Sequence, residues 1–278
     1  MPSFFEHQGR RLAYTAYGEG PRTVVLLHGL LLSQKMHRPL ARALARRGNR
    51  VVTLDLLGHG RSDRPRDMTA YSMPFFGEQV IALLDHLRVR EAVLAGTSLG
   101  ANATLEAAAA HPERVRGMVL EMPVLDNALL GCAIAFTPLM CALTFGEPVM
   151  RTVSAVTRRI PTGRVWGADV LLDTVRQQPG PSAAVLQGLF FGRVAPHRDV
   201  RRTIDRPALV IGHAHDPVHP FSDSGALVEE LPDARLLRAD SFLELRMNPE
   251  RLTDEIGAFV DHCWKPAARR RGAKAAAA

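Results

Sequence analysis

The sequence predicts an α/β protein with a doubly wound, mostly parallel sheet of about eight strands and a helical cap insertion. Two observations lead to this fold class. Short runs of aliphatic and β-branched residues alternate with longer stretches of helical periodicity. One of these runs, Thr-Val-Val-Leu-Leu at residues 23–27, is apolar throughout, which is typical of a parallel strand covered on both faces. With 278 residues, 46% of them hydrophobic, the chain can bury the core of one large domain.

The first half of the chain supplies most of the expected sheet. Two strands, at 4–8 and 12–17, are expected to form a hairpin that turns at Gly9-Arg10. Pro74 stands where a helix accepts proline, in the first turn. The alternation predicts, in order, a strand at 23–27, a helix at 39–47, a strand at 50–54, a helix at 74–87, a strand at 91–95, a helix at 101–110 and a strand at 115–120.

The alternation stops near residue 124 and resumes near residue 208. Residues 124–202 are apolar, helical in pattern and interrupted by prolines, so we predict a helical cap over the carboxyl edge of the sheet, where such folds bind ligands. The α/β core would then comprise 1–123 and 203–264, followed by a basic, disordered tail at 265–278. Its last elements are a strand at 208–211, a helix at 224–230, a strand at 234–237 and a helix at 249–264.

One stretch within the cap, residues 128–145, is uncharged and close to the length of a membrane span. Gly131 and Pro138 interrupt it, and the acids Asp126 and Glu147 flank it. We therefore predict a pair of short, buried, apolar helices here and no integral membrane segment.

Charge and cysteine content exclude several kinds of partner. The net charge is +7, but five cations lie in the acid-free segment 265–274, and the rest of the chain carries only +2. Nucleic acid is therefore not an expected partner. Three cysteines without a Cys-x-x-Cys pair indicate no disulfide framework, and the N-terminus lacks the pattern of a secretory signal. We expect a reducing, cytoplasmic location.

The most informative motif is Gly96-Thr97-Ser98-Leu99-Gly100, a Gly-x-Ser-x-Gly turn between the expected strand at 91–95 and the expected helix at 101–110. A serine on so sharp a strand-to-helix turn projects its hydroxyl away from the core, and the flanking glycines let neighbouring backbone approach. This position suits a nucleophile better than a packing residue.

Two further motifs follow the carboxyl ends of expected strands. His28-Gly29-Leu30 comes directly after the strand at 23–27, and Asp-Leu-Leu-Gly-His-Gly-Arg-Ser-Asp at 55–63 comes directly after the strand at 50–54. In this order and at these spacings, these two motifs and the serine turn resemble the α/β-hydrolase superfamily. The resemblance extends from about residue 4 to about residue 264.

The resemblance implies specific roles for several residues. Ser98 matches the nucleophile, and the backbone amides of Leu30 and Leu99 match the two donors that stabilise the transition-state oxyanion. The 55–63 loop, with His59 and Asp63, matches a structural loop. An aspartate at the nucleophile position would have indicated a dehalogenase or an epoxide hydrolase, and Ser98 argues against both.

The catalytic acid is expected after the strand at 208–211. Asp216 lies there, in a segment Asp-Pro-Val-His-Pro that resembles the corresponding segment of the superfamily. Some members carry the acid one strand earlier, so Asp126, after the strand at 115–120, is the alternative.

The general base is left open by the sequence. The resemblance places a histidine in the loop after the last strand, at or beside Phe242, but residues 239–250 contain no histidine. His215 and His219 flank Asp216 and could each turn toward Ser98, although a base so close in sequence to its orienting acid makes an awkward geometry. Without a base a serine hydroxyl is a poor nucleophile.

Metal and cofactor motifs are weak. His213-x-His215-x-x-x-His219 stands in a loop without a nearby cysteine, Gly-Lys-Ser/Thr is missing, and Gly58-x-Gly60 lacks the third glycine of a dinucleotide fingerprint. We therefore predict neither a metal nor a cofactor.

The expected cap is rich in side chains that would line an apolar pocket, namely Phe136, Met140, Phe145, Phe190 and Phe191. The leading hypothesis is a serine hydrolase that cleaves an ester, thioester or similar bond of a hydrophobic small molecule. Two alternatives stay open: a degenerate, non-catalytic member that binds a ligand or partner, and a non-hydrolytic enzyme on the same scaffold. The sequence does not give the oligomeric state.

Overall fold

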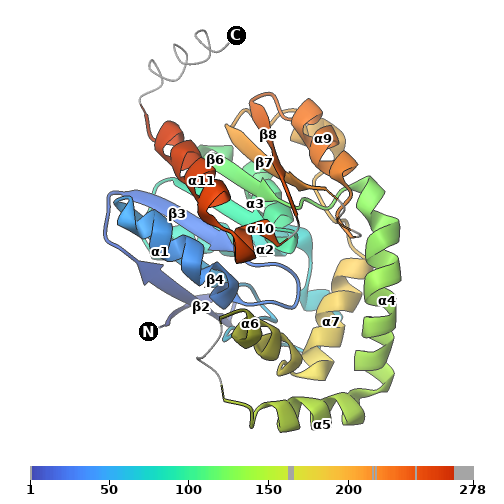
Figure 1. Ribbon diagram of the computed structural model, residues 1–278. Coiled ribbons are helices and arrows are strands. Elements are labelled where there is room, and N and C mark those ends of the chain that lie inside the picture. The colour runs from blue at the N-terminus through green and yellow to red at the C-terminus, as the bar shows by residue number, and fades with distance from the viewer. Residues whose placement is uncertain (1, 162–165, 215, 217, 242, 266–278) are drawn as a thin grey trace.

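The computed structural model describes residues 2–161, 166–214, 216, 218–241 and 243–265. Its centre is one eight-stranded sheet with the strand order β1-β2-β4-β3-β5-β6-β7-β8 (Figure 1). The hairpin β1–β2 is antiparallel and pairs antiparallel with β4, and all later neighbours are parallel. The predicted fold class and strand number are thus confirmed.

The strands are β1 (Ser3–His7), β2 (Arg10–Tyr17), β3 (Arg22–Leu27), β4 (Asn49–Asp55), β5 (Ala92–Thr97), β6 (Val115–Glu121), β7 (Ala208–His213) and β8 (Ala234–Ala239). The α-helices are α1 (Arg38–Arg46), α2 (Met73–His86), α3 (Leu99–Ala110), α4 (Leu129–Phe145), α5 (Glu147–Thr157), α6 (Trp166–Val175), α7 (Pro179–Phe190), α8 (Arg198–Arg201), α9 (Phe221–Glu230), α10 (Glu244–Met247) and α11 (Glu250–Cys263). Short 3₁₀ turns include η1 (Gln34–His37), η2 (Met68–Ala70), η3 (Pro112–Arg114) and η4 (Asp126–Ala128).

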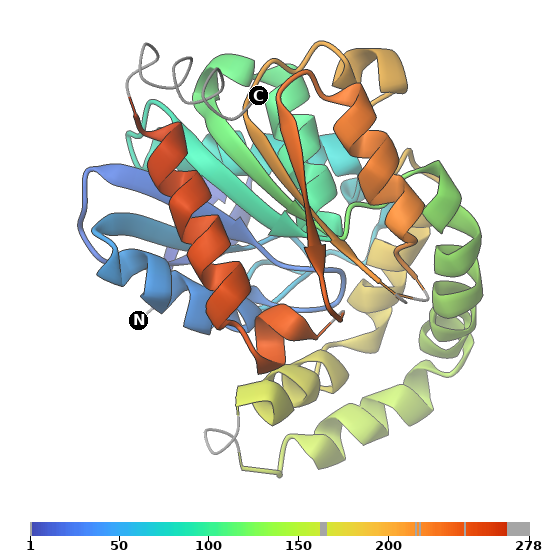
Figure 2. The same ribbon diagram turned by 45° about the horizontal axis from the view of Figure 1, so that its top comes forward.

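The continuous apolar run in β3 is explained by helices on both faces of the sheet. Val24 and Leu26 belong to the core cluster under α1 and α11, whereas Val25 and Leu27 belong to the cluster under α2 and α3. Because side chains alternate along a strand, each face of β3 requires its own apolar set. Figure 2 shows α1 and α11 together on one face of the sheet.

The turn of the first hairpin differs from the prediction by one residue. Its two central residues are Gln8 and Gly9, with φ of 47° and 70°, rather than Gly9-Arg10. Both φ angles are positive, as the preferred two-residue hairpin turn requires, and Arg10 is already paired with His7 in the ladder.

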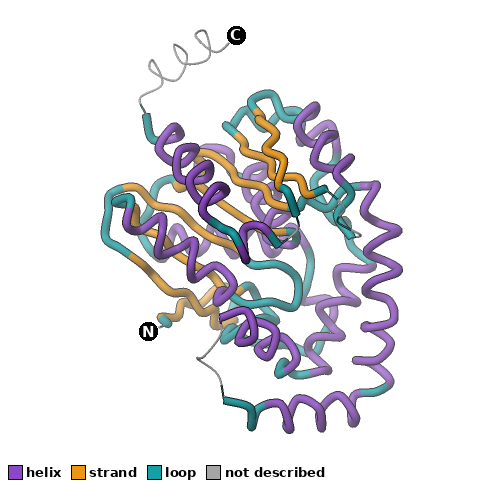
Figure 3. The backbone as a smooth tube through the Cα atoms, viewed as in Figure 1, coloured by secondary structure: helices purple, strands orange, loops and turns teal. Residues whose placement is uncertain are grey.

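Between β6 and β7 the described chain is helical, from η4 to α8, and contributes no strand to the sheet (Figure 3). We call residues 124–202 the helical insertion. In it α4 packs against α7, and Leu143 of α4 is buried with Ala183 and Leu186 of α7.

The predicted pair of short buried helices at 128–145 is wrong. One continuous helix, α4, holds Gly131 in its first turn and Pro138 in its interior. Much of α4 is exposed: Leu130 keeps 72% and Ile134 68% of its surface accessible. The prediction failed because apolar composition does not determine whether another segment of the chain packs over the helix. Within the described residues, one helix, Asp126–Phe145, is long and apolar enough to cross a membrane.

Two buried polar side chains of the core bind the backbone of the helical insertion. Asp223 of α9 accepts hydrogen bonds from the amides of Leu125, Asn127 and Ala128 at 2.7, 3.1 and 3.0 Å. Asn102 of α3 donates to the carbonyl oxygens of Val124, where the insertion begins, and of Val194, between α7 and α8, at 2.7 and 2.5 Å. The start of the insertion and the segment after α7 are therefore both tied to elements that pack against the sheet.

Residues 266–278 of the predicted basic tail at 265–278, together with His215 and Phe242, lie outside the described residues.

Replacing Asp223 tests this anchoring. In Asp223→Ala the three amides lose a buried, charged acceptor, so we expect the free energy of unfolding to fall by about 3 kcal/mol. Urea denaturation measures the change. Asp254→Ala, at a carboxylate that is 80% exposed, is the control and should lie near wild type. Equal stability of the two variants would contradict the anchoring role.

Candidate active site

Ser98 occupies a strained turn that its neighbours hold in place. Its φ is 53° and its ψ −113°, between the end of β5 and the first residue of α3. A Cβ at Gly96 would lie 2.1 Å from the carbonyl carbon of Gly100, and one at Gly100 would lie 2.2 Å from the Leu27 oxygen. Only glycine fits at either position, so the Gly-x-Ser-x-Gly pattern is a steric requirement of this crossing.

The loop after β7 brings a histidine to this serine. His219 Nε2 lies 2.9 Å from Ser98 Oγ, and His219 Nδ1 lies 3.0 Å from Asp216 Oδ2. An ionised carboxylate only accepts hydrogen bonds, so Nδ1 carries a proton toward Asp216. In the neutral ring Nε2 is then the free acceptor for the serine hydroxyl.

Asp216 shapes the loop that carries this histidine. Its Oδ1 accepts the backbone amides of Val218 at 2.8 Å and of His219 at 2.9 Å, while Oδ2 faces the ring. Burial alone would raise the pKa of Asp216, but these hydrogen bonds from His219 and Val218 hold it below its ordinary value. The carboxylate is therefore ionised at neutral pH, and an aspartate three residues before a histidine can orient its ring.

The structure thus brings together Ser98, Asp216 and one of the two histidines that the sequence left open, His219. His215 lies outside the described residues, and the alternative acid Asp126 is exposed at the start of η4. The sequence signal for His219 was the Asp-Pro-Val-His-Pro spacing. An aspartate three residues before a histidine can accept hydrogen bonds from the backbone of the turn between them and also from the histidine ring.

The two residues whose amides are expected to bind an oxyanion, Leu30 and Leu99, line the same pocket. Leu99 is the first residue of α3, so its N–H has no acceptor within the helix. Leu30 follows β3, and a Cβ built on neighbouring Gly29 would lie 4.0 Å from Ser98 Cβ. The side chains of Leu30 and Leu99 line one pocket with Ser98.

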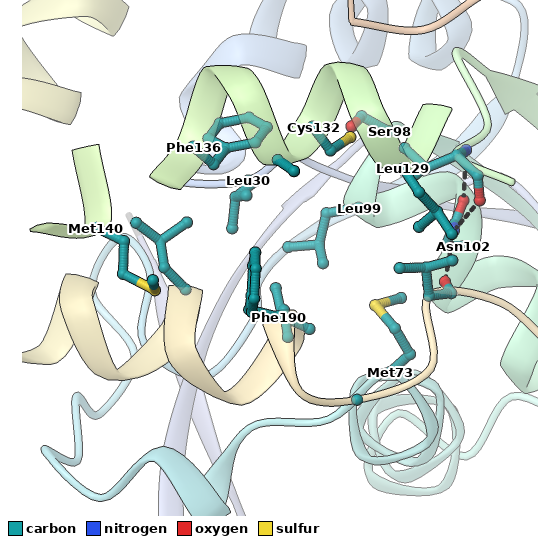
Figure 4. A pocket seen from close by; sticks show the side chains of 16 residues that line it. Leu30, Met73, Ser98, Leu99, Asn102, Leu129, Cys132, Phe136, Met140 and Phe190 are labelled. Atoms are coloured by element: carbon teal, nitrogen blue, oxygen red, sulfur yellow. Dashed lines mark hydrogen bonds between the residues drawn. The ribbon is translucent and has the colours of Figure 1, made fainter. Parts of the chain in front are cut away.

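That pocket has a volume of about 410 Å³ and is mostly apolar. Figure 4 shows Ser98 near one end of the cavity and Met140 of α4 at the other. Its described lining comes from the core and from the helical insertion: Leu30, Met73, Ser98, Leu99, Asn102, Val124, Leu129, Cys132, Ala133, Phe136, Met140, Leu186, Leu189, Phe190, Gly192 and Val194. Burial raises the pKa of the Cys132 thiol to about 11, so this lining thiol stays protonated.

The histidines of the two loops before the nucleophile have structural contacts. His28 Nε2 accepts the amide of Leu56 at 3.1 Å, and His59 Nδ1 lies 2.9 Å from the Leu57 oxygen. Burial lowers the pKa of both rings, which are therefore neutral. Asp63 accepts the amide of Arg11 at 2.8 Å, so the 55–63 loop is held to β2.

Beneath Ser98 lies a buried charged cluster that sequence reasoning missed. Arg246 of α10 donates to Glu121 at the end of β6, with Nη2 2.8 Å from Oε2, and Thr97 Oγ1 donates to the same oxygen at 2.5 Å. His213 Nε2 lies 3.5 Å from Glu121 Oε1. The Glu121 carbonyl also accepts the Ser98 amide at 2.8 Å, so the cluster supports the nucleophile from below.

In this cluster, burial and ion pairing shift the pKa values of the titratable groups in opposite directions. Burial would raise the pKa of Glu121, but Arg246 and His213 bring it well below its ordinary value. Burial would lower the pKa of His213, but Glu121 holds it above its ordinary value. The available signal in the sequence was a glutamate directly after the apolar run Met-Val-Leu at 118–120, and its partner Arg246 stands 125 positions later.

Comparison with known proteins agrees with this geometry. A family model described as alpha/beta hydrolase fold matches residues 22–133, which include Leu30, the Ser98 turn and Glu121. The enol-lactonase from Burkholderia xenovorans LB400 superposes with a TM-score of 0.74 over 93% of this chain and 100% of its own, at 23% identity. The chain has the α/β-hydrolase fold, and its residues 22–133 match the model of that family.

Relatives of this chain carry different names. The haloalkane dehalogenase of Mycolicibacterium paratuberculosis is 27% identical over 253 residues, which are 84% of this chain and 81% of the dehalogenase. The dihydrolipoyllysine-residue acetyltransferase component of the acetoin cleaving system of Pseudomonas putida is 31% identical over 241 residues, 80% of this chain but 59% of that protein. Two other relatives are matched over only 39% and 20% of their lengths.

Removing Arg246 tests the charged cluster. In Arg246→Met the buried Glu121 loses its main counter-ion, so we expect the free energy of unfolding at neutral pH to fall by about 3–5 kcal/mol. In the wild type the lowered pKa of Glu121 stabilises the fold above about pH 4.5, and this contribution is lost as the pH falls through the folded pKa. In the variant burial raises that pKa, so the difference in stability should shrink toward acid.

Urea unfolding at neutral pH and near pH 4.5 measures both effects. Arg251→Met removes an arginine whose side chain is 45% exposed and which pairs with Glu244, and it should cost less than about 1 kcal/mol. A pH-independent loss in Arg246→Met, or one no larger than that of Arg251→Met, would contradict the account.

Proposed function

We propose that this protein is a serine hydrolase that cleaves an ester, thioester or similar carbonyl bond of a hydrophobic small molecule. The observation that carries the proposal is the hydrogen-bonded chain Ser98 Oγ–His219–Asp216, with separations of 2.9 and 3.0 Å. A nucleophile, a base within reach of it and an acid orienting that base are the three parts that such a reaction requires.

In the proposed mechanism, Ser98 Oγ attacks the substrate carbonyl carbon while His219 Nε2 takes the hydroxyl proton. Asp216 stabilises the imidazolium that forms, and the amides of Leu30 and Leu99 bind the oxygen that becomes negative. When the tetrahedral intermediate collapses, the alcohol or thiol leaves with the proton from His219. Water then repeats these steps on the acyl-enzyme, releasing the acid and restoring Ser98.

The pocket supports a hydrophobic acyl group as the bound part of the substrate. Its polar lining is limited to a few side chains, among them Ser98, Asn102 and Cys132, and the amide of Asn102 is already engaged with Val124 and Val194. A chain attached to the reacting carbonyl would extend from Ser98 toward Phe136 and Met140 (Figure 4).

The names of the relatives favour different chemistries, and the residue at the nucleophile position of this chain supports one of them. Ser98, rather than an aspartate, occupies the nucleophile position, which argues against the activities in the names haloalkane dehalogenase and epoxide hydrolase. A serine nucleophile with a base and two backbone amides that can bind an oxyanion is suited to a carbonyl substrate. The same assembled triad argues against a binding protein without turnover.

Serine-directed labelling and ester hydrolysis test the proposal. We expect Ser98→Ala to abolish labelling by a fluorophosphonate, and His219→Ala to lower kcat/KM for p-nitrophenyl esters by about 10⁴- to 10⁶-fold. His215→Ala, at the residue directly before Asp216 in the sequence, is the matched control and should keep near-wild-type activity. Full activity in His219→Ala, or an equal loss in His215→Ala, would refute the assignment of the base.

The size of the pocket predicts a preference among acyl chains. Met140→Trp fills the end of the cavity remote from Ser98, so we expect kcat/KM for long-chain p-nitrophenyl esters to fall by about tenfold or more while acetate ester hydrolysis stays near wild type. The ratio of the two rates is the measurement. A uniform loss for all chain lengths would show that the acyl group does not occupy this cavity.

A further inference from the structure

The outer side of α4 is an apolar surface that the described chain leaves uncovered. Leu130, Ile134, Cys141 and Phe145 recur at intervals that place them on one side of the helix, and Leu130, Ile134 and Phe145 keep 72%, 68% and 83% of their surface exposed. On α5, Val149, Val153 and Val156 share a side in the same way and are also exposed. We call these seven residues the apolar face.

The other side of α4 already has a function. Leu129, Cys132, Phe136 and Met140 face the cavity over Ser98. The helix is therefore apolar on both sides, although only one side is covered within the described chain. Such a helix is found in a protein core or against lipid, and exposed apolar patches mark sites of interaction.

The charged residues near the apolar face distinguish between two candidate partners, a lipid surface and a second copy of this chain. Residues 127–146 include no acidic or basic side chain. The exposed cations that follow are Arg151 on α5, and Arg158 and Arg159 directly after the end of α5. The one acid of this helix, Glu147, pairs with Arg66 and Arg151. An apolar surface with a cationic border complements anionic lipid headgroups, whereas a second copy related by a two-fold axis would present the same cations to this border.

We propose that the apolar face docks on the surface of an anionic lipid bilayer. Helix α4 then lies along the interface and does not cross it, because Asp223 and Asn102 bind the start of the insertion to the core and the inner side of α4 covers the cavity. Phe145 and Ile134 enter the acyl region, and Arg151, Arg158 and Arg159 stay among the phosphates.

The same placement gives a route for substrate. Leu129 and Phe190 line the cavity and are 45% and 50% exposed, so the entrance is bordered by apolar side chains. This step rests on the proposed function: an ester dissolved in the bilayer would reach Ser98 without crossing water. The docking itself depends only on the apolar face and the neighbouring arginines, and not on the proposed reaction.

Vesicle flotation tests the docking directly. We expect the full chain to float with vesicles of phosphatidylcholine and phosphatidylglycerol and to bind phosphatidylcholine alone weakly. Ile134→Glu should reduce binding at least tenfold, because a charge enters the apolar contact. Arg158→Gln with Arg159→Gln should reduce it on the order of 30-fold on anionic vesicles only. Met247→Glu, at an apolar residue that is 69% exposed on α10, is the control and should bind as wild type.

Two further variants separate the alternatives. Ser98→Ala should bind vesicles like the wild type, so a failure of the proposed reaction leaves this test intact. Arg269, Arg270 and Arg271 changed together to Ala should also retain binding, and its loss would assign the contact to the basic tail instead. Equal binding by Ile134→Glu, or a dimer in solution that Ile134→Glu dissociates while wild type fails to bind vesicles, would overturn the proposal.

Discussion

The Asp216 carboxylate receives three hydrogen bonds, two from backbone amides through one oxygen and one from the His219 ring through the other. The backbone pair closes the turn after β7, and this closure directs the histidine of the same turn at Ser98. A single ionised side chain thus sets the shape of the loop, the tautomer of the base and its direction. If this carboxylate were removed, the base would lose both its position and its counter-charge.

The serine side of the site depends on a different constraint. Gly96 and Gly100 allow β5, α3 and β3 to approach closely, and the Glu121 carbonyl holds the Ser98 amide. In the superfamily pattern the loop after the last strand supplies the histidine. In this chain the short helix α10 after β8 carries Arg246, which lies beneath the Ser98 turn and pairs with Glu121. The two loops after β7 and β8 thus contribute in different ways, one to the proposed proton transfer and the other to the support of the turn.

Much of the fold followed from the sequence, since strand runs and motifs are local properties. Ser98 and Asp216 were identified because each is tied to the end of a strand. The choice of His219 could not be made, because it depends on how one aspartate closes its own turn. The pairing of Glu121 with Arg246 joins residues 125 positions apart, and the exposure of α4 depends on what packs against it. Neither is encoded in a local pattern.

The central claim is that His219, oriented by Asp216, is the base for Ser98. A crystal structure of the enzyme inactivated by an alkyl phosphonate tests it most directly, because the adduct imitates the tetrahedral intermediate. The account predicts phosphorus on Ser98 Oγ, His219 Nε2 within hydrogen-bond distance of that oxygen, and the phosphoryl oxygen bound by the amides of Leu30 and Leu99. An adduct in which another side chain faces Ser98 Oγ, with His219 turned away, would contradict it.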